Sequence, residues 1–137
     1  MQQSPTDSID TNIVLRYILG DIPAQRTKAA SFLKTPDSTH FLSNQAILEC
    51  IYVMENTLEM PRTEVVDLMN FFLTRHADQI EYDRNITAIA FPYYLEHSKL
   101  SWADCTLAAE AEIKHREPLY TFDRKLATQT SQAKLLE

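Results

Sequence analysis

Residues 119–126 read LYTFDRKL, a segment in which a strand pattern passes directly into a helix pattern. Its apolar and aromatic first half predicts a short strand, and the segment around Leu126 predicts a short helix, with Asp123 between the two. Near the start of the chain the same order recurs. Ser8-Ile9-Asp10 predicts the end of a short strand, and the residues after it predict a helix that stops at Gly20. In both places an acidic residue stands where a strand gives way to a helix.

Strand and helix patterns alternate along the rest of the chain. Further short strands are predicted at 39–42, 79–82 and 133–136, with helices beginning near Ser43, after Pro61, after Asp83 and after Ser101. This alternation predicts an α/β fold, with a central parallel sheet of four or five short strands flanked by helices. Because 137 residues suit one compact domain, we predict a single domain spanning residues 1–137.

Composition excludes several classes of enzyme. Gly20 is the only glycine, so the chain contains neither a phosphate-binding Walker loop nor a glycine-rich dinucleotide turn. Its histidines form no HExxH motif, and its cysteines have no metal-ligand spacing. The net charge of −6 argues against a protein that holds nucleic acid by bulk electrostatics. It is compatible with a nuclease whose negative charge is concentrated in a metal site.

The sequence also indicates a compartment. No window approaches the roughly 20 consecutive apolar residues of a membrane span, and residues 1–7 lack the basic start and apolar core of a secretion signal. Cys50 and Cys105 are interpreted as reduced thiols in a reducing environment. We therefore expect a cytoplasmic protein without membrane contact.

Four acidic residues are candidates for the chemistry. Ligands of open parallel sheets bind beyond the carboxyl ends of the strands, where Asp10 and Asp123 are predicted to lie. Asp104 falls in the first turn of a helix, and such helix starts face the same edge. Glu49 is the only charged residue in the apolar run 46–54, where a carboxylate is costly unless it is paired, hydrogen-bonded or metal-bound. Together they predict one acidic cluster.

Each of these acids also has a simpler interpretation. Asp10 and Asp123 are equally explained as turn or helix-capping residues. Asp104 fits a capping box at the start of its helix. Glu49 suits a surface position or an ion pair with Arg16. Considered one at a time, the residues leave both interpretations open.

Four segments, taken together, favour the acidic cluster over the simpler interpretations. They are IDTNIVLRY at 9–17, LECIYV at 48–53, SWADCTLAA at 101–109 and LYTFDRKL at 119–126. In this order they resemble PIN-domain proteins and, within that family, the VapC-like toxins of bacterial toxin–antitoxin pairs. The chain departs from the family pattern before its first aspartate, because Ile9 stands almost alone where a longer apolar run is usual.

The resemblance implies a Mg²⁺- or Mn²⁺-dependent ribonuclease. Its metal-binding and catalytic residues would be Asp10, Glu49, Asp104 and Asp123. Mg²⁺ prefers oxygen ligands and usually takes one or two carboxylates directly, so four acids would serve one or two ions partly through water. The metal would activate a water molecule and stabilise charge on the phosphate. The four negative charges of the cluster would account for much of the −6.

The resemblance has further implications for supporting residues and partners. Asn12 and Thr121 are implied as polar supports of the cluster, and a homodimer inhibited by a small cognate antitoxin is implied as the assembly. Arg16, Arg124 and Lys125 are candidates for binding the RNA backbone, although solvated surface charge explains each of them as well. The alternatives are a PIN nuclease in RNA processing and a PIN-like binding module without activity.

Overall fold

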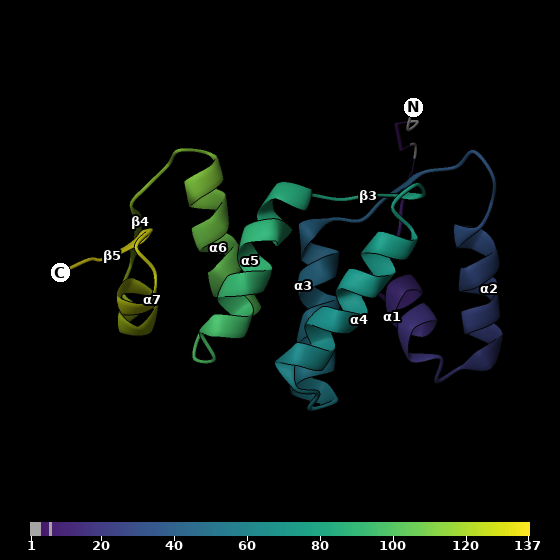
Figure 1. Cartoon of the computed structure of the whole chain (residues 1–137), viewed down its shortest axis with the longest axis horizontal. Helices are drawn as coiled ribbons and strands as arrows, with labels where there is room; N and C mark the ends of the chain where they lie inside the picture. Colours follow the sequence, from purple (N-terminus) through teal and green to yellow (C-terminus); the bar gives the residue numbers. More distant parts are fainter. Residues whose placement is uncertain (1–3, 6) are drawn as a thin grey trace. The chain divides into compact units, whose positions relative to one another are not determined.

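The computed structural model describes residues 4–5 and 7–137 (Figure 1). Part of the N-terminal segment assessed above for a secretion signal therefore lies outside the described residues. The chain divides into two compact units, Met1–Tyr82 and Asp83–Glu137. No helix in the described ranges has the length and apolar character needed to cross a membrane.

The first unit is built on three very short parallel strands. These are β1 (Asp7–Ser8), β2 (His40–Phe41) and β3 (Ile80–Glu81), in the order β1-β2-β3. Asp7 pairs with His40, and His40 pairs with Ile80. Its helices are α1 (Thr11–Leu19), α2 (Pro23–Leu33), α3 (Asn44–Tyr52), the π-helical turn η1 (Val53–Thr57) and α4 (Arg62–Arg75).

The second unit contains a helical pair and a small sheet. Its elements are α5 (Arg84–Glu96), α6 (Trp102–Ile113), β4 (Leu119–Thr121), α7 (Arg124–Gln129) and β5 (Ala133–Leu135). Helices α5 and α6 pack through aromatic rings, with Trp102 in edge contact with Tyr94 at 5.6 Å between centroids. Strands β4 and β5 pair in parallel, with Leu119 opposite Ala133.

The α/β class and the short parallel strands are confirmed. Among the described residues, β1, β2 and β3 form a parallel sheet in the first unit, and β4 and β5 form a parallel pair in the second. The connection between β4 and β5 is short. Only α7 and its two flanking loops separate these strands, so they pair with each other, as strands close in sequence usually do.

Gly20 ends α1 and allows the turn into α2. Its φ of 63° lies in the left-handed region, and its amide donates to the carbonyl of Arg16 at 3.1 Å. After the turn, Arg26 reaches back to α1, because its Nε donates to the carbonyl of Tyr17 at 3.2 Å and its guanidinium lies 5.2 Å from the Tyr17 ring centroid. The α1–α2 hairpin is thus fixed at its closed end.

We predict that Gly20→Ala lowers the free energy of unfolding by about 1 kcal/mol or more, because a Cβ is disfavoured at positive φ. The added Cβ would also lie 3.1 Å from Cδ of Arg26. Gly20→Asn is the matched variant and should lose less, because asparagine tolerates this conformation better. Urea denaturation followed by circular dichroism measures both, and equal stability of wild type and Gly20→Ala would contradict the prediction.

Candidate functional site

Asp10 stands at the junction of β1 and α1. The amide of Ile9 still donates to the carbonyl of Phe41 at 2.9 Å, and α1 begins two residues later. Asp10 caps this helix, with Oδ1 accepting from the amide of Thr11 at 2.6 Å. The side chain is exposed, and within the described residues its Oδ2 has no protein partner. Asp10 therefore has one oxygen fixed by the helix and one that faces solvent.

Glu49 lies on α3 and is linked to α1. Its Oε2 accepts a hydrogen bond from Oγ1 of the buried Thr11 at 2.8 Å. Glu49 is exposed, so the apolar residues around it in sequence belong to other faces of α3. The suggested pairing with Arg16 does not form, because Arg16 instead pairs with Asp21 at 3.1 Å.

The two carboxylates line one hollow between α1 and α3. This hollow, here called the acidic hollow, has a volume of about 370 Å³ and is bordered by Asp10, Thr11, Asn12, Leu15, Leu48, Glu49, Tyr52 and Val53. Cys50 lies beneath it, fully buried, with Sγ 3.8 Å from the carbonyl of Thr11. Burial raises the pKa of the Cys50 thiol to about 12, and the negative charges of Glu49 and Asp10 add to the rise. Both carboxylates thus act on the same buried group.

Asp104 and Asp123 belong to the second unit, where the side chain of each accepts a hydrogen bond at the N-terminus of a helix. Asp104 completes a capping box in α6, because its Oδ2 accepts from the amide of Ser101 and its own amide donates to Ser101 Oγ, both at 3.1 Å. Asp123 caps α7, with Oδ1 accepting from the amides of Lys125 at 2.9 Å and Leu126 at 3.4 Å. Thr121 supports this turn, since its Oγ1 accepts from the Asp123 amide at 2.9 Å.

Helix capping and metal binding are compatible for all three aspartates. Asp10, Asp104 and Asp123 each use one carboxylate oxygen for a backbone amide. In the part of the chain that the structure describes, the second oxygen of each has no protein hydrogen bond. A divalent cation with oxygen ligands needs such a free oxygen, so the capping role of these residues does not exclude the metal-binding one.

The structure brings Asp10, Asn12 and Glu49 together at the acidic hollow. The convergence of Asp104 and Asp123 with them remains a prediction. Over residues 4–5 and 7–137, no group of three or more histidine, cysteine, aspartate or glutamate side chains is arranged to hold a metal ion. In its chemistry the pair of Asp10 and Glu49 suits Mg²⁺, because this ion prefers oxygen ligands, usually takes one or two carboxylates and completes its shell with water.

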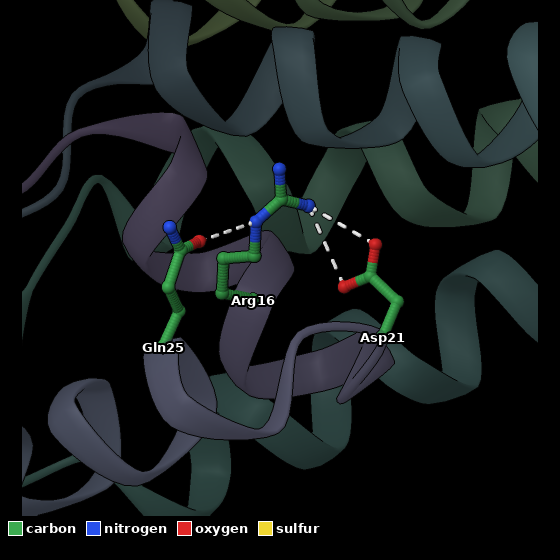
Figure 2. Close-up of polar contacts among 3 residues, drawn as sticks. All are labelled: Arg16, Asp21 and Gln25. Atoms are coloured by element: carbon green, nitrogen blue, oxygen red, sulfur yellow. Dashed lines mark hydrogen bonds and ion pairs between the residues drawn. The ribbon is translucent and has the colours of Figure 1, made fainter.

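The basic candidates have different surroundings. Arg16 is held in place, because its Nε donates to Gln25 at 2.8 Å and its Nη1 pairs with Asp21 (Figure 2). Arg124 and Lys125 are exposed in the first turn of α7, directly after Asp123. Their role in RNA binding remains a prediction.

Two residues at the acidic hollow were not predicted from the sequence. Thr11 orients Glu49 through its hydroxyl, and Tyr52 borders the hollow with 60% of its surface exposed. Tyr52 follows Glu49 by three residues on the same helix, a spacing that places side chains on one face. That spacing was the available signal for Tyr52, whereas the contact of Thr11 depends on how α1 packs against α3.

Comparison with known proteins identifies a family. A family model described as PIN domain matches residues 8–130, which takes in most of both units. No curated protein matches the chain.

We predict that iodoacetamide labels neither cysteine of the native protein at pH 8. Cys50 and Cys105 are fully buried, and the raised pKa of Cys50 keeps its thiol protonated and therefore unreactive. In denaturant both should react completely, which serves as the control. Mass spectrometry of the alkylated peptides distinguishes the two sites, and rapid labelling of native Cys50 would contradict the geometry beneath the acidic hollow.

Proposed function

Since the chain belongs to the PIN domain family, whose members are generally nucleases, we propose that it is a Mg²⁺- or Mn²⁺-dependent endoribonuclease. It would hydrolyse phosphodiester bonds of RNA. The observation that carries the proposal is the pair of Asp10 and Glu49, which come from distant parts of the sequence and line one hollow. Both carboxylates are exposed and oriented by protein hydrogen bonds.

The proposed metal ligands are Asp10 and Glu49, with Asp104 and Asp123 completing the acidic set. PIN domains usually bind Mg²⁺ or Mn²⁺ through acidic residues. The bound ion would supply a water molecule of lowered pKa and stabilise charge on the phosphate and the leaving oxygen.

The protein's own groups would position these ligands. Thr11 holds the Glu49 carboxylate at 2.8 Å, and the first turn of α1 holds Asp10 at 2.6 Å. Ligands fixed in this way lose little freedom when a cation and the substrate phosphate bind. The exposed Asn12 borders the same hollow and offers an amide donor to a phosphate oxygen.

The same proposal includes a more specific biological role. The four segments that resemble VapC-like proteins favour a toxin of a toxin–antitoxin pair, acting in the cytoplasm as a homodimer that a small antitoxin holds inactive. Cys50 and Cys105 are buried and form no disulfide, which is consistent with a reducing compartment. A role in RNA processing and a binding module without activity gain no specific support.

We predict that Asp10→Asn, Glu49→Gln, Asp104→Asn and Asp123→Asn each reduce RNA cleavage by about 100-fold or more while the protein stays folded. Loss of one ligand disturbs water activation and charge stabilisation together. The matched controls are Asp67→Asn and Glu64→Gln, two exposed acids of α4, which should cleave at the wild-type rate. Cleavage of labelled RNA with Mn²⁺ measures all six variants, and wild-type rates in two of the first four would refute the assignment.

Melting curves test whether Asp123 belongs to the metal site. A cation that binds only the folded state stabilises it by about 2.7 kcal/mol at a hundred times its dissociation constant. Mn²⁺ should therefore raise the Tm of the wild type relative to EDTA, and raise that of Asp123→Asn less. Asparagine caps a helix as well as aspartate does, so a capping role alone predicts identical metal responses. In EDTA, relief of repulsion between the acids should make Asp123→Asn the more stable protein.

A further inference from the structure

A second hollow lies beside the acidic one. It is bordered by residues of α1 and α2, among them Asn12, Ile13, Arg16, Gln25, Lys28 and Phe32, and it is here called the α1–α2 hollow. Its volume of about 580 Å³ is within the range of roughly 300–1,000 Å³ that is typical of small-ligand pockets. Asn12 borders both hollows, so a chain molecule bound at the acidic hollow can continue into this one.

The two hollows have opposite charge. The acidic hollow carries Asp10 and Glu49, whereas the described lining of the α1–α2 hollow includes Arg16 and Lys28 and no acidic residue. Arg16 is paired with Asp21 at 3.1 Å, so Lys28 is the cation of this lining for which the described residues show no ion pair. An anion is therefore the ligand that its charge favours.

Arg16 is already oriented for such a ligand. Figure 2 shows its guanidinium held between Gln25 and Asp21, with Nε and Nη1 engaged. Its Nη2 carries no hydrogen bond to any of the described residues. Because the planar group is fixed, little conformational freedom is lost when a phosphate oxygen binds there. Lys28 adds a second, exposed cation.

Phe32 supplies a fixed aromatic surface. Its ring stacks on the ring of His40 with centroids 4.4 Å apart and an interplanar angle of 27°. His40 is itself buried and held by a contact of 2.6 Å between its Nδ1 and Oδ1 of Asp7. Phe32 nevertheless remains 42% exposed and borders the hollow. An exposed aromatic ring beside cations suits a nucleic-acid base with its phosphate.

We propose that the α1–α2 hollow binds one unpaired nucleotide of single-stranded RNA next to the cleaved bond. The base stacks on Phe32, the phosphate pairs with Arg16 and Lys28, and the amide of Gln25 or Asn12 contacts the base edge or the ribose. The identity of the ligand as RNA rests on the function proposed above. The position of the nucleotide follows from the aromatic ring, the two cations and the continuity through Asn12.

Binding is measured without cleavage, in EDTA, with a short single-stranded RNA that contains 2-aminopurine, whose fluorescence falls on stacking. Phe32→Ala should weaken binding about tenfold and remove the quenching, because stacking contributes about 1–3 kcal/mol per base. Phe32→Trp should retain both binding and quenching. Lys28→Gln should reduce the slope of log Kd against log salt by about one. Phe71→Ala and Lys99→Gln, at exposed positions outside both hollows, are the matched controls.

The outcomes separate this proposal from the proposed function. Unchanged binding and quenching in Phe32→Ala and Lys28→Gln would overturn the nucleotide site, whether or not the wild type cleaves RNA. RNA binding by the wild type without cleavage in Mn²⁺ would contradict the nuclease function alone, and the variants would still decide the nucleotide site. Failure of the wild type to bind the RNA in EDTA would overturn the nucleotide site, and cleavage in Mn²⁺ would then decide the nuclease function separately.

Discussion

The structure depends on side chains that cap helices immediately after very short strands. Strands of two or three residues form few ladder hydrogen bonds, so they constrain the following helices only weakly. The first amides of a helix have no partner within the helix itself, and a capping side chain that satisfies one contributes about 0.5–2 kcal/mol. Among the described residues, four helices begin with such a cap directly after a strand, from Asp10, Ser43, Asp83 and Asp123, and Ser101 caps α6 after the loop that follows α5.

This constraint also determines how the groups of the candidate site are held. Asp10 belongs to the cap of α1, and the next residue, Thr11, links that helix to Glu49 on α3. The groups proposed to bind a cation are therefore the groups that fix the local backbone. The turn at Gly20 connects α1 to α2. Helix α2 contains Lys28 and Phe32, which border the neighbouring α1–α2 hollow.

The sequence predicted those features whose causes are local. Ser43, the capping box of Ser101 and the stop at Gly20 are short-range signals, and each appears where it was expected. The sequence did not show which strands pair with one another, because strand pairing depends on which partners the connections allow. The exposure of Glu49 was also uncertain from the sequence. An apolar run does not show which position of a helix faces solvent until its neighbours are packed.

The hollows could not be predicted for a related reason. Their residues are separated in sequence, and their volume depends on the spacing between helices. Arg16 is an example. Its charge suggested contact with RNA, but its orientation is determined by contacts with Asp21 and Gln25, and no local sequence pattern predicts these contacts. Thr11 likewise has an ordinary place at a helix start, and only the packing of α3 gives its hydroxyl a carboxylate partner.

Each of the three aspartates caps a helix with one carboxylate oxygen and has a second oxygen without a hydrogen bond to the described residues. This division has an evolutionary consequence. A drift from aspartate to asparagine would preserve the oxygen that caps the helix while it removes the negative charge. If these aspartates bind the proposed cation, descendants with asparagine would lose cleavage and keep their fold, and they would remain available for selection as binding proteins. Within a lineage, asparagine at these positions would then mark the loss of metal binding alone, whereas an aliphatic residue would mark the loss of both metal binding and helix capping.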